Sequence, residues 1–148
     1  MVKLQPFVQA YLTYQESVWL MNRNGIIVPT GGHLVPQGEE PKVISDIRLP
    51  EELIRERIER LSGTKDYLLH GFGNGTYQNR RFITRSPGGQ NFHDVTVYFG
   101  KFNSKPATSE GDLALLTLSD LERIASSLDH KYKVLEHSRL ALEYSADH

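Results

Sequence analysis

Three glutamates near the middle of the sequence are spaced so that they could act together chemically. Glu52, Glu56 and Glu59 follow one another at intervals of four and three residues, so on a helix they would share one face. Carboxylates one helical turn apart can converge on a hard cation such as Mg²⁺. The alternative is a solvated stripe whose charges pair with neighbouring arginines, which is the usual state of a charged helix face.

Arginines of the same segment offer a different chemistry. A guanidinium holds phosphate oxygens through two parallel hydrogen bonds, so Arg57 and Arg60 could bind a phosphorylated ligand directly. They could equally pair with nearby acids, and the sequence leaves both interpretations open. His33 and His93 could contact a phosphate or a base, although a single histidine near a strand is more often structural. Further arginines that could contribute lie elsewhere in the chain: Arg80, Arg81 and Arg85.

The composition limits the class of partner. The chain has 148 residues, 39% of them hydrophobic, which favours one domain over residues 1–148 with a real core. The formal net charge of -1 gives no bulk attraction to nucleic acid or to an anionic membrane. Cysteine is absent, and no apolar run approaches the length that spans a bilayer. We therefore expect a cytoplasmic protein whose metal ligands, if any, are oxygen or imidazole.

The residues that could do chemistry must be positioned by a mixture of strands and helices. Apolar residues at helical spacing predict a helix over residues 50–61, with Pro50 in its first turn and Gly63 just past its end. Strands are predicted from aromatic, β-branched and alternating residues, with a tight hairpin between the first two. They cover residues 7–14, 16–21, 26–28, 67–72, 94–102 and 113–118.

Two helices are predicted to close the chain. Ser119 and Asp120 are plausible caps of the first, whose apolar residues are Leu121, Ile124 and Leu128. The last helix is predicted over residues 131–144. The predicted order is strands first, with one helix between them, and two helices at the end. This order indicates a mixed α/β chain without the regular alternation of a doubly wound fold.

Two stretches of the sequence resemble the signature of the Nudix hydrolase superfamily. The opening Pro-x-Gly-Gly-His, then Gly-Glu, is matched by Pro29, Gly31, Gly32, His33, Gly38 and Glu39. The family's helix is matched in register by Pro50, Glu51, Glu52, Leu53, Ile54, Ile58, Ser62 and Gly63. The flanking strands and helices agree as well, so the resemblance covers nearly the whole chain. A glycine pair can also be a tight connection between short strands.

The resemblance implies an α/β (α+β) fold, namely an α/β/α sandwich with a mixed sheet, and it would allow a homodimer. The family's helix normally presents a glutamate after an arginine and then a glutamate pair, which bind Mg²⁺ or Mn²⁺. With Gly63 as the anchor, these three positions are Arg57, Arg60 and Leu61. Neither arginine nor leucine can ligate a cation, so the Nudix box is degenerate.

Some acids could still build a relocated site. A register shifted by one residue places Glu56 and Glu59 on ligand positions, but it puts Arg57 where core packing needs an apolar residue. Glu39 keeps its family-like position. Glu110 lies where many relatives carry a later acid, although it could also belong to a polar turn. If the protein is catalytic, we expect an unusual metal site with Glu39, Glu56 and Glu59 as ligands and Glu56, Glu59 and Glu110 as catalytic groups, and with Glu52 on the same helix face.

Two functions from different classes follow. The first is a domain that recognises a nucleoside diphosphate-linked ligand or a partner protein without hydrolysis and without a cofactor. Its ligand would be contacted by residues of the glycine motif and the helix: Gly31, Gly32, His33, Arg57 and Arg60. The second is a divergent hydrolase that cleaves a nucleoside diphosphate-linked substrate with Mg²⁺ or Mn²⁺. The composition of the helix favours the first.

Overall fold

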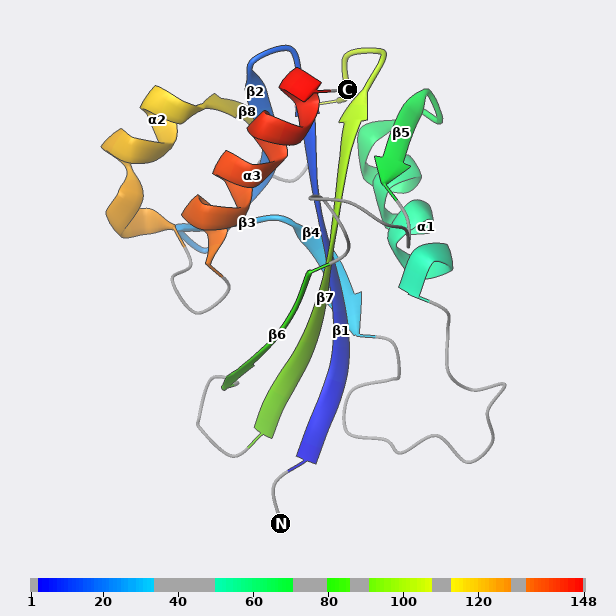
Figure 1. The fold of residues 1–148 in the computed structure, drawn as a ribbon, viewed down its shortest axis with the longest axis vertical. Helices are drawn as coiled ribbons and strands as arrows, with labels where there is room; N and C mark the ends of the chain where they lie inside the picture. The colour runs from blue at the N-terminus through cyan, green and yellow to red at the C-terminus, as the bar shows by residue number, and fades with distance from the viewer. Residues whose placement is uncertain are drawn as a thin grey trace.

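The computed structural model describes residues 3–33, 50–70, 80–85, 91–107, 113–128 and 133–147. A twisted mixed sheet runs through this part of the chain, and helices lie on both of its sides (Figure 1). Its central strands, β1 (Lys3–Tyr14) and β7 (Asn91–Phe102), pair in parallel along almost their whole length. A parallel pair is normally covered on both faces, and this sheet is.

Shorter strands extend the central pair. The main path of the sheet runs β3-β2-β1-β7-β5, while β4 pairs with β1, β6 with β7 and β8 with β2. Strands β5 and β6 therefore share one side of β7, one along each half. The bounds of these strands are β2 (Ser17–Arg23), β3 (Ile26–Val28), β4 (Thr30–His33), β5 (Tyr67–His70), β6 (Arg80–Arg85) and β8 (Leu113–Thr117).

Each face of the sheet has its own apolar core. On one face, helix α1 (Pro50–Ser62) packs against Val8, Ala10 and Leu12 of β1. On the other, α3 (Val134–Asp147) and α2 (Leu118–Arg123) cover a cluster that includes Tyr11 and Val97. Side chains of a strand alternate between faces, which is why β1 supplies both cores. The predicted α/β/α sandwich with a mixed sheet is confirmed.

Helix α1 forms as its sequence predicts. Leu53, Ile54 and Ile58 are buried, so the apolar face points into the core. Gly63 follows the helix with a left-handed φ of 74°. Its N–H donates to the carbonyl of Glu59 at 3.1 Å, which satisfies one of the carbonyls left open at a helix end. The predicted end of the helix at Gly63 is therefore confirmed.

Several local expectations were wrong. The glycine pair is not a connection between strands, since it lies inside β4. Strand β6 was not among the predicted strands, because the sequence between residues 72 and 94 is rich in turn-forming residues. Both strands are short, and each pairs along its whole length with a long strand, β4 with β1 and β6 with β7. Strand β7 begins earlier than predicted, at Asn91. Residues 71 and 72, the predicted end of β5, lie outside the described residues.

The closing helices also differ from expectation. Thr117, rather than Ser119, caps α2 by accepting a hydrogen bond from the N–H of Asp120, whose carboxylate bonds back to the N–H of Thr117. The helix stops after Arg123 and a short 3-10 turn, Ala125–Ser127, follows. Helix α3 begins at Val134, and residues 131 and 132 lie outside the described part of the chain.

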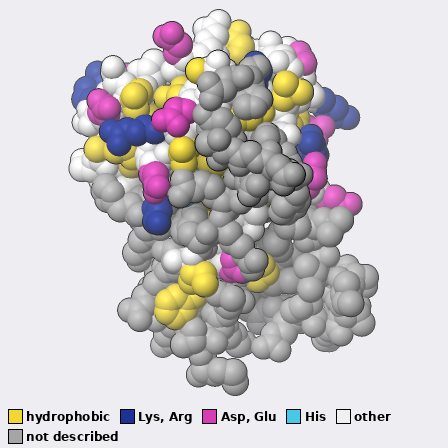
Figure 2. All heavy atoms as spheres, viewed as in Figure 1, with side chains coloured by type: hydrophobic (Ala, Val, Ile, Leu, Met, Phe, Trp, Pro, Cys, Tyr) yellow, Lys and Arg dark blue, Asp and Glu magenta, His cyan; other side chains and the backbone are white. Residues whose placement is uncertain are grey.

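Charges of both signs are interspersed on the surface. Figure 2 shows acidic and basic side chains next to one another over the upper part of the face that it presents. Two of the ion pairs are Arg123–Asp120 at 3.1 Å and Arg139–Glu122 at 3.3 Å. Among the described helices, none is long and apolar enough to cross a bilayer.

Candidate functional site

Strand β4 carries the two adjacent glycines of the sequence motif, and each meets a different neighbour. Gly31 pairs with Gln9 and Gly32 with Val8 in the antiparallel β1–β4 ladder. A Cβ at Gly31 would collide with the carbonyl oxygen of Val8, so this close approach of two backbones requires glycine. A Cβ at Gly32 would instead lie 3.3 Å from Nη2 of Arg57. Gly32 therefore presents its backbone to side chains of α1.

Helix α1 turns an arginine, not a carboxylate, toward Gly32. The Cβ position at Gly32 is 3.3 Å from Cδ2 of Leu53 as well as from the Arg57 guanidinium, so one turn of α1 covers this glycine. Arg57 is half-buried while Glu56 is exposed, because neighbours in a helix point about 100° apart. Arg60 is exposed and lies between Glu56 and Arg57 around α1, four residues after the first and three after the second.

Glu59 lies on a different side of α1, in a hydrogen-bond network with β5. The hydroxyl of Tyr67 donates to Oε2 of Glu59 at 3.4 Å, and Nη1 of Arg55 donates to the same hydroxyl at 3.5 Å. Arg55 also pairs with Glu51 at 3.0 Å. Burial raises the pKa of Tyr67, so the phenol keeps the proton that it donates. This network ties α1 to the sheet.

The carboxylates of α1 do not gather beside Gly32. Glu52 and Glu56 are exposed, and Glu59 bonds to Tyr67. Within the described ranges, no group of three or more histidine, aspartate or glutamate side chains is placed to hold a metal ion. Glu39 and Glu110 lie outside these ranges. The charged group beside Gly32 is the Arg57 guanidinium, which is positive and has no lone pair to offer a metal ion.

Comparison with known proteins gives structural neighbours only. No protein-family model and no curated protein matches the chain. A Nudix-family hydrolase from Clostridium perfringens has a TM-score of 0.67 at 18% identity, over 94% of this chain and 96% of that one. The Ap4A hydrolase of C. elegans has a TM-score of 0.57 at 16% identity, over 99% of this chain and 98% of that one. The Nudix domain of Shewanella oneidensis NrtR, solved with ADP ribose, has a TM-score of 0.59 at 15% identity, over 96% and 90%.

This chain has the Nudix fold. The likeness covers nearly the whole sequence, as the motifs indicated. In this fold, β4 carries Gly31, Gly32 and His33, and α1 is the helix whose sequence resembles that of the Nudix box.

The two histidines of interest lie on β4 and β7, the strands that pair with β1 on its two sides. His33 ends β4 and pairs in register with Phe7. His93 is buried on β7, and its ring stacks on the ring of Phe7 with centroids 5.4 Å and planes 3° apart. His93 thus packs as a planar aromatic group, as a structural histidine does. The other arginines considered, Arg80, Arg81 and Arg85, all belong to β6.

Thr30 is a polar residue of the site that the sequence analysis missed. It lies two residues before Gly32 on β4, so both face α1. Its side chain is 2% exposed, and Oγ1 finds no hydrogen-bond partner within the described part of the Nudix fold. Period-two alternation from Gly32 would have assigned Thr30 to this face, but nothing in the sequence indicated the missing partner.

Proposed function

We propose that this protein recognises a nucleoside diphosphate-linked ligand and holds its phosphates with arginine instead of a metal ion. The observation that carries the proposal is the contact between Arg57 and Gly32. It brings a guanidinium to the position where the family pattern has a metal-binding glutamate.

The chemistry of this contact suits a diphosphate. Gly32 is buried beneath Leu53 and Arg57, so a ligand at this point would meet the guanidinium rather than the glycine backbone. The guanidinium of Arg57 can bind two phosphate oxygens at once, and its partial burial strengthens the attraction relative to open water. Arg60, exposed three residues further along α1, would supply a second positive charge for the other phosphate.

The class of ligand is supported by the structural neighbours. The NrtR domain was solved with ADP ribose, and another neighbour is an Ap4A hydrolase. Both ligands contain adenosine joined to a chain of phosphates. We therefore choose ADP ribose as the first probe.

Weak or absent hydrolysis follows from the position of the acids on α1. A carboxylate that activates water against a diphosphate works beside a metal that orients the water. Glu56 is exposed while Arg57 is half-buried, and Glu59 accepts a hydrogen bond from Tyr67. A divergent hydrolase would need these two acids, together with Glu39 and Glu110, to converge on Mg²⁺ or Mn²⁺.

Titration calorimetry with ADP ribose tests the binding. We expect the wild type to bind equally well with Mg²⁺ and with EDTA. Arg57→Gln should weaken binding about ten- to a hundredfold, because a hydrogen bond to a charged group is worth roughly 1.5–3 kcal/mol. Arg57→Lys should recover only part of the loss, since lysine lacks the planar fork. Arg23→Gln, which removes an exposed arginine of β2, is the matched control and should bind normally.

An assay of ADP ribose cleavage tests the alternative. Mg²⁺-dependent turnover that disappears in Glu56→Gln and Glu59→Gln would decide for the divergent hydrolase. Equal affinity of the wild type and Arg57→Gln would contradict the role of Arg57.

A further inference from the structure

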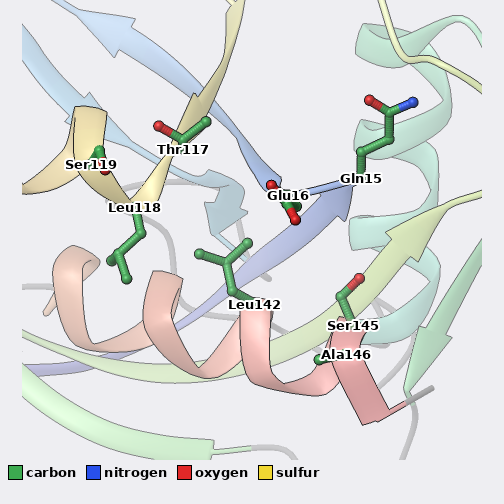
Figure 3. A pocket seen from close by; sticks show the side chains of 8 residues that line it. All are labelled: Gln15, Glu16, Thr117, Leu118, Ser119, Leu142, Ser145 and Ala146. Atoms are coloured by element: carbon green, nitrogen blue, oxygen red, sulfur yellow. The ribbon is translucent and has the colours of Figure 1, made fainter.

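A hollow lies on the side of the sheet opposite α1, where three distant segments meet. Its volume is about 480 Å³, within the usual range for small-molecule sites. It is formed by the turn between β1 and β2, the junction of β8 with α2, and the last turns of α3 (Figure 3). The residues that line it are Gln15, Glu16, Thr117, Leu118, Ser119, Leu142, Ser145 and Ala146.

The centre of the hollow is apolar. In Figure 3 the side chains of Leu118 and Leu142 project toward each other from α2 and α3. Leu118 is 36% exposed, one of the few large apolar side chains in the described part of the chain that water reaches to this extent. An apolar group seated between the two leucines would remove this surface from water, which is favourable.

The rim of the hollow is polar and negative. Glu16 carries the only charge among its described lining residues, and Ser119 and Ser145 add hydroxyl groups. Ser145 and Ala146 belong to the last turn of α3, where unpaired carbonyls give the end of a helix a partial negative charge. Glu16 and the carbonyls at the end of α3 accept hydrogen bonds, and the hydroxyls accept or donate them. The first turn of α2, which is partly positive, also lies in the hollow, so it is the full charge of Glu16 that favours a cation.

We propose that this hollow binds a small aliphatic primary amine in its ammonium form. The alkyl chain would lie between Leu118 and Leu142. The ammonium group, which has three donors, would bond to Glu16 and to the hydroxyl or carbonyl oxygens at the end of α3. This site is separate from Gly32 and Arg57, so it stands whether or not the protein binds ADP ribose.

Amide NMR of the labelled full chain, titrated with hexylamine at neutral pH, tests the proposal. We expect saturable shifts at residues 15–16, 117–119 and 142–146, and smaller shifts with hexanol, which matches the chain but lacks the charge. Glu16→Gln should weaken binding roughly two- to fivefold, as expected for an exposed charge pair. Glu143→Gln removes an exposed acid of α3 that does not line the hollow, and it should leave the affinity unchanged.

Chain length tests the apolar part separately. Hexylamine should bind roughly tenfold more tightly than ethylamine, since partial burial of four further methylene groups contributes that much. Leu118→Ser, at a partly exposed position, should remove most of this difference. The proposal is overturned if hexanol binds as well as hexylamine, if Glu16→Gln and Glu143→Gln behave alike, or if no saturable shifts occur in the hollow.

Discussion

Gly31 and Gly32 should respond differently to replacement by alanine. The change at Gly31 should lower stability, and the change at Gly32 should disturb the candidate site. At Gly31 the new methyl group would collide with the carbonyl oxygen of Val8, and it would lie 3.1 Å from Cγ of Gln9. The obstacle is backbone, so strands β1 and β4 must move apart. At Gly32 the methyl group would meet Nη2 of Arg57 and Cδ2 of Leu53, both at 3.3 Å. These are the ends of flexible side chains, which can shift.

The size of the effect follows from the hydrogen bonds of the β1–β4 ladder. Separating the strands at Gly31 leaves one or two buried backbone groups unpaired, at roughly 1–3 kcal/mol each. We expect Gly31→Ala to lower the free energy of unfolding by about 2–4 kcal/mol, a large part of the roughly 5–15 kcal/mol typical of a domain. Gly32→Ala should change it by less than about 1 kcal/mol, because the small clash is offset by reduced freedom of the unfolded chain.

Urea unfolding followed by the fluorescence of Trp19 measures both changes. Trp19 is the only tryptophan of the chain, is 1% exposed, and donates from Nε1 to the carbonyl of Ala107 at 3.1 Å, so its emission reports the folded core. The m-values should stay constant if only the native state is affected. Gly32→Ala should nevertheless weaken ADP ribose binding, because it displaces Arg57. Equal destabilisation by the two variants would refute the reasoning about Gly31.

Three further outcomes are expected. Gly63→Ala should destabilise the protein by about 1 kcal/mol, because φ is 74° at this position and alanine rarely adopts a left-handed conformation. No atom lies within 4 Å of the new methyl group, so the cost comes from the backbone alone. Gly63→Asn should destabilise the protein less, and equal losses for the two variants would contradict a backbone cause. Burial, with a further contribution from the charge of Glu51, raises the pKa of Tyr98 from 10.0 to about 12, so the unfolded chain loses this proton first and stability should fall between those pH values. Alkaline urea titrations should show that Tyr98→Phe lacks this fall. Hydrogen bonds from the backbone N–H of Thr117, and then with its side chain, lower the pKa of Asp120. The Asp120 carboxylate therefore stabilises the folded state fully at pH values above the ordinary pKa of aspartate, and this stabilisation is lost as the pH falls through the lowered pKa. When the stability of Asp120→Asn is measured as the pH is lowered, this loss should be absent. A variant whose stability depends on acid pH as that of the wild type does would contradict the role of Asp120.

The sequence by itself determined the elements whose signals are local. Helix α1 was predicted because Leu53, Ile54 and Ile58 recur at helical spacing and Gly63 can adopt a left-handed φ. The long strand β7 was predicted largely from alternation, and the Nudix fold from short motifs in register. Each of these signals depends on residues that are near one another in the chain, so no tertiary contact was needed to detect it.

The tertiary structure alone decided which residues meet. Whether Arg57 or Glu56 faces Gly32 depends on the rotation of α1 against β4, and residues 34–49 separate these elements in the sequence. The hydrogen bond between Tyr67 and Glu59 depends on where β5 lies beside α1. The hollow around Leu118 joins three segments that strand pairing and helix packing bring together. Contacts of this kind leave no periodic signal in a single sequence, since the fold of the whole chain sets the distances.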